Sequence, residues 1–281
     1  MPRIQALDEI TSRLGQPFLL RWVDTPYGGA AAVARFRHRG AVVDLSACGT
    51  FRLIFHLKSS QIKRRQGSQA QPCEIPRVGS VTTSFTLVPE RIEVLGPADT
   101  VHLLFSTELT TACKQRSASL DLPQNQPAMR AAAVQALVAT TLDGTDLRLE
   151  SVVASIASEI VRDVTATNRA VGGLSPQASR AVRSLLEERV SCGVRVLELA
   201  QVAGISLHHF IKACRRSEGF TPHALLLHKR IERSLALLLR HKMSVEETAI
   251  TVGFSSPSHF ISTFRRLVGV TPKALKRAAG S

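Results

Sequence analysis

The chain has 281 residues, of which 44% are apolar, so it is long enough for about two domains with buried cores. It lacks a run of eighteen apolar residues and a signal-like N-terminus, which argues against a membrane span and against secretion. Five scattered cysteines without a CxxC pair argue against a zinc site and a disulfide framework. We therefore expect a cytoplasmic protein that does not associate with membranes.

The formal net charge of +14 is unevenly distributed along the chain. Residues 176–281 hold 17 basic and 7 acidic side chains, whereas the preceding 175 residues hold 19 and 15. A basic surplus concentrated in one region is typical of a surface that binds phosphate groups.

Residues 18 to about 110 have the pattern of short strands. Apolar side chains alternate over 50–58 and 91–95, and residues 101–105 form a mostly apolar run of strand length. Glycines punctuate the segment at turn-like intervals. This pattern predicts a small sandwich or barrel.

Three histidines fall in this strand-rich region: His38, His56 and His102. No His-x-His pair occurs there, so we expect no metal site, and we interpret His56 and His102 as pocket-wall or core residues. The chain shows no Ser-His-Asp or Cys-His arrangement and no glycine-rich phosphate loop. We therefore expect no enzymatic activity and no cofactor.

The next segment predicts a helical hairpin. Residues 127–139 are rich in alanine, and residues 147–164 carry an apolar stripe at helical spacing. Residues 168–173 resemble a linker, after which Ser175 and Pro176 are suited to begin a new helix.

The last hundred residues contain one unit twice. His209-Phe210-Ile211 returns as 259–261, Arg215-Arg216 as 265–266, and Thr221-Pro222 as 271–272, all fifty residues later. Gly204 and Gly253 are forty-nine residues apart, so one residue is gained or lost just after the glycine. Such a repeat indicates a repeated supersecondary unit.

Each copy has the pattern of a helix-turn-helix. A short amphipathic segment ends at Gly204 or Gly253, and serines follow that can cap a second helix: Ser206 in the first copy, Ser255 or Ser256 in the second. The second helix of such a unit can enter the major groove of DNA. Cys192 and Cys214 lie in apolar helical surroundings, and we expect both to be buried.

These motifs resemble the DNA-binding domain of the AraC/XylS family of bacterial transcription regulators. The similarity extends over about 176–277 and is densest in Gly253-Phe-Ser-Ser-Pro-Ser-His-Phe260, in Phe264-Arg-Arg266 and in Gly269-Val-Thr-Pro272. It implies an α+β protein of three parts. These are a β-rich, cupin-like sensory domain over 1–118, a helical hairpin and linker over 119–173, and an all-α domain with two helix-turn-helix units over 174–281.

The resemblance also implies a function. We expect a sequence-specific transcription regulator, an activator in sign, that binds double-stranded DNA and RNA polymerase, responds to a small-molecule effector and forms a homodimer through the hairpin. The apolar stripe of the hairpin fits equally well a cover for the β-domain. Two alternatives remain open: a regulator without an effector, and a β-domain enzyme tethered to DNA.

Matching the family's motif residue by residue places the expected site residues. The base-reading residues are His208, Ile211, Lys212, Ser258, Ile261 and Ser262. The phosphate-binding residues are Ser206, Arg215, Arg216, Lys229, Arg230, Ser255, Arg265 and Arg266. The effector pocket is assigned to Phe51, Phe55, His56 and His102, and dimerisation to Val152, Ile156 and Ile160.

Overall fold

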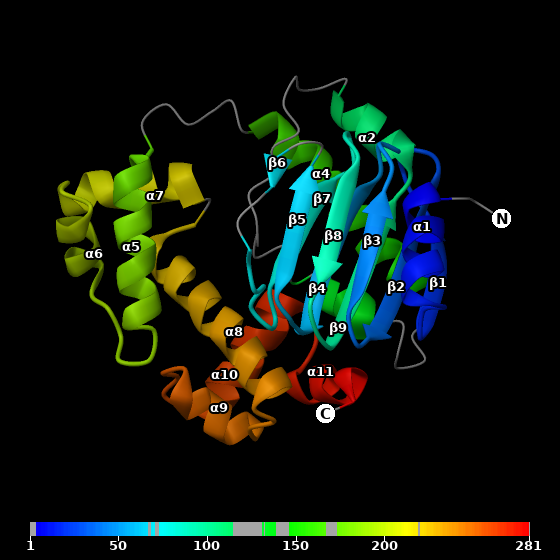
Figure 1. The fold of residues 1–281 in the computed structure, drawn as a ribbon. Coiled ribbons are helices and arrows are strands. Elements are labelled where there is room, and N and C mark those ends of the chain that lie inside the picture. Colours follow the sequence, from blue (N-terminus) through cyan, green and yellow to red (C-terminus); the bar gives the residue numbers. More distant parts are fainter. Residues whose placement is uncertain are drawn as a thin grey trace. The chain divides into compact units, whose positions relative to one another are not determined.

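The structure is a computed structural model and describes residues 4–66, 69–70, 73–114, 131, 133–138, 146–166, 173–218 and 220–280. Internal contacts divide the chain into two compact units. The first comprises residues 1–166 together with 268–281, and the second comprises residues 167–267. Figure 1 follows the helices and strands of both units along the chain.

Two antiparallel sheets form the body of the first unit. Their strand orders are β1-β2-β9-β4-β7 and β3-β8-β5-β6. The predicted strands over 50–58, 91–95 and 101–105 are confirmed as β4, β8 and β9. The strand bounds are β1 Leu19–Asp24, β2 Ala30–His38, β3 Ala41–Leu45, β4 Phe51–Lys58, β5 Ile62–Gln66, β6 Gln69–Ala70, β7 Val81–Phe85, β8 Glu90–Val94 and β9 Ala98–Phe105.

The two sheets share one apolar core, which makes the first unit a sandwich. Phe36 and Leu104 from one sheet lie in the same buried cluster as Val43 and Ile92 from the other. Helix α1, Gln5–Leu14, packs against β3 and contributes Ala6, Leu7 and Ile10 to this cluster. We did not expect α1, although these three apolar side chains are spaced as on one face of a helix.

Helices lie on the other face of the larger sheet. Helix α2, Thr107–Lys114, packs on β4, and α4, Asp146–Ala166, packs on β1 and on α2. Every side chain of β4 from Phe51 to Leu57 is buried, because one face meets the second sheet and the other meets these helices. Together with the helical second unit, this arrangement confirms the α+β class.

The helical character of the predicted hairpin is confirmed in two places, since residues 133–138 are helical and α4 follows, while their arrangement as a hairpin stays a prediction. Its turn, the start of its first helix and most of the linker lie outside the described residues. In α4, Ile156 and Ile160 are buried within the first unit, while Val152 is half-buried. This burial favours the stripe as a cover for the β-domain, and dimerisation through α4 stays a prediction.

The second unit consists of helices. Its elements are α5 Pro176–Glu188, α6 Val196–Val202, α7 Leu207–Glu218, α8 Pro222–Arg240, α9 Val245–Thr251 and α10 Pro257–Val268; α11, Pro272–Ala279, is grouped with the first unit. As predicted, Ser175 caps α5 by accepting a hydrogen bond from the backbone N–H of Ala178, and Pro176 is its first residue. The central helix α8 packs against α5, α6, α7 and α9.

One prediction about the second unit is wrong. Cys192 is exposed, because it lies in the turn between α5 and α6 rather than in a helix, whereas Cys214 on α7 is fully buried as expected. Among the described residues, no helix combines the length and the apolar character that a membrane crossing requires.

Candidate DNA-binding surface

The first repeat forms a helix-turn-helix from α6 and α7. Gly204 ends α6 with a φ of +69°, a backbone conformation that favours glycine. The next residue, Ile205, donates its backbone N–H to the carbonyl of Ala200 at 3.2 Å, which closes the turn. Ser206 then caps α7, because its hydroxyl accepts the backbone N–H of His209 at 3.4 Å.

The second repeat reproduces this geometry in α9 and α10. Gly253 has a φ of +85°, and the backbone N–H of Phe254 donates to the carbonyl of Ala249 at 3.0 Å. The cap is Ser256, whose hydroxyl accepts the backbone N–H of His259 at 3.2 Å. The extra residue predicted just after the glycine is therefore confirmed in the stretch between Gly253 and Ser256.

Helix α7 divides into a buried and an exposed face. Phe210, Ala213 and Cys214 are buried, and Phe210 and Cys214 pack in a cluster with side chains of α5, α6 and α8. The opposite face carries four exposed side chains at helical spacing: His208, Ile211, Lys212 and Arg215. Three of them are predicted base readers, so the fold leaves these side chains in reach of a ligand.

Helix α10 has an aromatic core and a small exposed surface. The Phe260 ring packs edge-to-face against Phe254 at 5.3 Å and against Phe264 at 5.6 Å between ring centroids. Ser258 and Ser262 are exposed and Ile261 is half-buried. Phe264 corresponds to Cys214 of the first copy, so the second copy fills the equivalent space with a larger side chain.

Exposed arginines end both candidate recognition helices. Arg215 and Arg216 lie in the last turn of α7, and Arg265 and Arg266 lie at the same place in α10. Within the part of the chain that the structure describes, Arg215, Arg265 and Arg266 form no ion pair. Exposed guanidinium groups without a partner suit phosphate oxygens.

The two residues of α8 that are predicted to contact phosphate, Lys229 and Arg230, form intramolecular contacts. The Nζ of Lys229 lies 3.1 Å from a carboxylate oxygen of Glu232 and 3.5 Å from one of Glu187. Arg230 donates from Nε to the carbonyl of Val190 at 3.1 Å, and its guanidinium lies 5.6 Å from the centroid of the Phe254 ring. Phosphate contact by Lys229 and Arg230 stays a prediction, and it would require these contacts to be shared or released.

The two serines predicted to contact phosphate, Ser206 and Ser255, differ in whether they already form an intramolecular hydrogen bond. Ser206 is exposed but its hydroxyl oxygen already caps α7, whereas Ser255 is exposed beside the true cap of α10, Ser256. A capping hydroxyl still has its own hydrogen to donate to a phosphate, so both serines keep their predicted role.

The first unit contains a partly open cavity of about 50 Å³. Two of the four predicted effector residues, His56 and His102, line this cavity, while Phe51 and Phe55 do not, because they project from the opposite face of β4. Sequence reasoning missed two other lining residues, Arg52 and Arg64. Arg52 alternates with the apolar side chains of β4, and this alternation alone does not show that both faces of the strand are buried.

Two of the three histidines that line the cavity, His56 and His102, have strongly lowered pKa values, which leave them uncharged at neutral pH. Burial, followed by the charge of Arg64, lowers the pKa of His56 to about 3, and burial holds the pKa of His102 well below its usual range. His56 Nε2 lies 3.0 Å from the Thr82 hydroxyl, and His102 Nε2 lies 3.0 Å from the Thr100 hydroxyl. The described residues include no cluster of three or more His, Cys, Asp or Glu side chains that is suited to a metal ion.

Known proteins resemble the C-terminal part of this chain. A family profile described as "Helix-turn-helix domain" matches residues 199–278. The chain is 31% identical to the HTH-type transcriptional regulator GlxA of Rhizobium meliloti over 109 residues, which cover 39% of this chain and 34% of GlxA. It is 31% identical to the virulence regulon transcriptional activator VirF of Yersinia enterocolitica over 99 residues, or 35% of this chain and 36% of VirF.

A third relative is the invasion protein InvF of Salmonella typhimurium, with 28% identity over 117 residues that cover 42% of this chain and 54% of InvF. The matched region thus spans between 34% and 54% of the length of these relatives. The profile match covers both repeats and, with these relatives, supports the resemblance drawn from the sequence.

Proposed function

We propose that the chain is a sequence-specific DNA-binding transcription regulator of the AraC type, because residues 199–278 match a helix-turn-helix profile and the chain is similar to transcription regulators. The observation that carries this proposal is the repeated geometry of α7 and α10. Each helix begins after a glycine turn, buries one apolar face, leaves the other face exposed and ends in two exposed arginines. This is what a helix needs in order to enter a major groove and hold the flanking phosphates.

Helices α7 and α10 contribute differently to DNA binding in this proposal. On α7, Lys212 donates to guanine O6 or N7, Ile211 contacts a thymine methyl group, and His208 contributes a further polar contact. On α10, Ser258, Ile261 and Ser262 offer a shorter and less polar surface. The first copy therefore discriminates among sequences more strongly, and the second contributes more to anchoring.

Phosphate contacts come from Arg215, Arg216, Arg265 and Arg266, with Ser206 and Ser255 near the N-terminal ends of the two helices. Contacts of this kind position the protein on the duplex and carry no sequence information. Their number sets the dependence of affinity on salt.

The first unit supplies control in this proposal. Its cavity lies inside the sandwich and receives an effector, whose binding changes DNA engagement or assembly of a homodimer. The similarity to VirF, which is named a transcriptional activator, supports activation as the sign of regulation, with RNA polymerase as the partner at the promoter.

Selection from random DNA duplexes tests this function without a known operator. The full-length protein should enrich one sequence motif from the pool, and the enriched duplex should outcompete a scrambled duplex of equal length. Specific binding is expected to exceed non-specific binding by a factor of about 10³ or more. A full-length protein that retains duplexes without enriching any motif would contradict sequence-specific regulation.

A matched pair of variants assigns the motif to α7. Lys212→Ala should change the enriched motif, whereas Lys63→Ala, which removes an exposed lysine from β5, should leave it unchanged. The same change in both variants would show that the motif does not depend on α7.

A further inference from the structure

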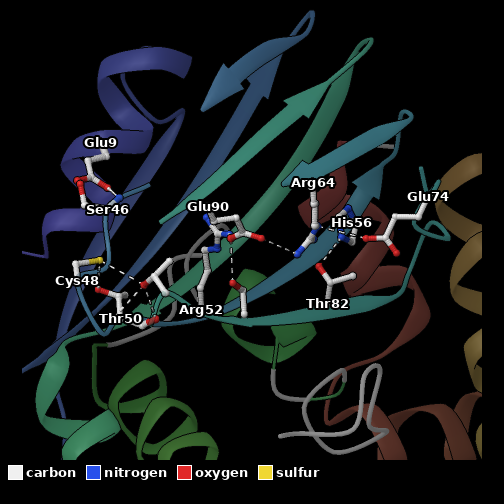
Figure 2. Close-up of polar contacts among 12 residues, drawn as sticks. Glu9, Ser46, Cys48, Thr50, Arg52, His56, Arg64, Glu74, Thr82 and Glu90 are labelled. Atoms are coloured by element: carbon white, nitrogen blue, oxygen red, sulfur yellow. Dashed lines mark hydrogen bonds and ion pairs between the residues drawn. The ribbon is translucent and has the colours of Figure 1, made fainter. Parts of the chain in front are cut away.

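The cavity of the first unit contains more buried positive than negative charge. The Arg52 side chain is 2% exposed and that of Arg64 is 9% exposed, while the carboxylate that lies between them, Glu90, is 1% exposed. Arg52 Nη2 lies 3.3 Å from Glu90 Oε2, and Arg64 Nη1 lies 3.6 Å from Glu90 Oε1 (Figure 2). A single buried carboxylate thus faces two buried guanidinium groups.

Glu74 offsets this charge only in part. Its Oε1 lies 3.3 Å from Arg64 Nε, but its side chain is 51% exposed, so water screens its charge. Burial lowers the pKa of Arg52 to about 10 against the opposing effect of Glu90, which leaves Arg52 charged at neutral pH. The neighbouring His56 and His102 are neutral and supply no negative charge.

Several polar atoms of the cavity wall have no hydrogen-bond partner among the described residues. They are the Nε atom of Arg52, the hydroxyl of Ser59 and the Nδ1 atoms of His38 and His102. Arg64 Nε forms no hydrogen bond either, although it lies 3.3 Å from Glu74 Oε1, and Glu90 Oε1 is a buried acceptor without a hydrogen bond. A guanidinium Nε can only donate, and buried donors without an acceptor are unfavourable. The unpaired Nε of Arg52 and the surplus of buried positive charge therefore favour a ligand with acceptor oxygens and a negative charge.

Apart from Ser60 and Thr100, the rest of the cavity wall is apolar. Side chains from α1 and from both sheets line it, and they are Ile10, Leu14, Val43, Ile54, Ile62, Ile92, Val94 and Ala98. The volume of about 50 Å³ compares with roughly 10–15 Å³ for one water and about 150 Å³ for a cavity that binds benzene. The space therefore suits a compact molecule with one polar end and a short apolar end.

We propose that the cavity binds a short-chain monocarboxylate, with its carboxylate held by Arg52 and Arg64 and its alkyl end against Ile54, Ile62 and Ile92. The planar guanidinium fork matches the two oxygens of a carboxylate. This inference rests on the proposed function in that it assigns the chemical class of the effector.

Titration of the full-length protein with sodium acetate, propionate and butyrate tests the site, with chloride adjusted to keep ionic strength constant. Saturable binding should appear in calorimetry, together with a rise in melting temperature, because a ligand that binds only the folded state stabilises it. Propionamide, which has the same shape without the charge, should produce neither effect. Absence of binding by all three acids, or equal binding of the amide, would refute the proposal.

Variants on β5 test whether Arg64 binds the carboxylate of the ligand. Arg64→Gln should weaken propionate binding about tenfold or more, which corresponds to the loss of a charge-assisted hydrogen bond. Arg65→Gln removes the same charge from the exposed face of the same strand and should bind as the original protein does. Arg64→Lys, which keeps the charge but not the fork, serves if Arg64→Gln does not fold, and undiminished binding in the folded variant would contradict the assignment.

DNA affinity measured in the same solutions separates this inference from the proposed function. If propionate binds but DNA affinity and self-association do not respond, the site stands and effector control is wrong. If the protein binds its DNA motif and no carboxylate binds, DNA recognition stands and the carboxylate site is wrong. If hexanoate binds more tightly than propionate, the size argument is wrong.

Discussion

Replacement of both Arg265 and Arg266 by alanine should weaken binding to every DNA sequence alike and should flatten the dependence of affinity on salt. The two side chains are exposed in the last turn of α10 and form no ion pair within the described part of the chain. Their loss therefore leaves the protein's internal contacts intact and removes only contacts to the ligand.

The magnitude follows from the number of exposed arginines. Each phosphate contact contributes about −0.9 to the slope of log K against log salt concentration, so four contacts give a slope of about −3.6. Between 50 and 200 mM salt, that slope corresponds to a loss of affinity of roughly 150-fold. With two contacts removed, the slope falls to about −1.8 and the loss to roughly 12-fold.

Fluorescence anisotropy with a labelled selected duplex and a scrambled duplex, measured at several salt concentrations, gives both slopes. A double variant of Arg21→Ala and Arg39→Ala removes the same charge from exposed positions in the first unit and should leave the slope almost unchanged. A loss confined to the selected duplex, or an equal change of slope in the control, would refute the phosphate role of Arg265 and Arg266.

Three further outcomes concern stability. Ile156→Asp should lower the melting temperature of the first unit strongly, because burying an unpaired carboxylate costs several kcal/mol, while Ser155→Asp on the exposed side of α4 should have little effect. Dissociation of a dimer without loss of stability would instead support an interface at α4. Gly253→Ala should destabilise the second unit more than Gly204→Ala. Both glycines have a positive φ, but a Cβ at Gly253 would come 2.5 Å from a backbone carbonyl oxygen, while a Cβ at Gly204 meets no atom within 4 Å. Equal losses of unfolding free energy in urea would argue against this packing. The pKa of His56 is lowered to about 3 in the folded state, so its contribution to stability is complete above the usual 6.5 and declines as pH falls below that value. His56→Gln should therefore reduce the slope of unfolding free energy against pH by about 1.2 kcal/mol per pH unit between about pH 4 and 5.5, and an unchanged slope would contradict the neutrality of His56.

The parts of the molecule that rest on local signals could be predicted from the sequence. Gly204 and Gly253 mark turns because few other residues adopt their backbone conformation, and Phe210 and Phe260 follow at the spacing of a buried helix face. The second unit is built from such short-range patterns, so its helices and its exposed faces followed from the residues alone.

The cavity of the first unit could not be predicted in the same way. Strand alternation separates Phe51 and Phe55 from Arg52 and His56, but it does not show which faces of the strand are buried, so the sequence assigned Phe51, Phe55 and His56 to one pocket. In the structure both faces are buried, because α2 and α4 cover one and the second sheet covers the other. Such burial depends on pairings between strands far apart in the chain, which no local pattern encodes.

The central claim is that α7 reads base pairs, and a base-by-base scan of the selected duplex with Lys212→Ala tests it most directly. The scan should show a loss of about 1–3 kcal/mol of discrimination at one base pair, a G·C pair in the original protein, with the other positions unchanged. Lys63→Ala should reproduce the original profile at every position. A profile for Lys212→Ala that matches the original protein at all base pairs would contradict the placement of α7 in the major groove.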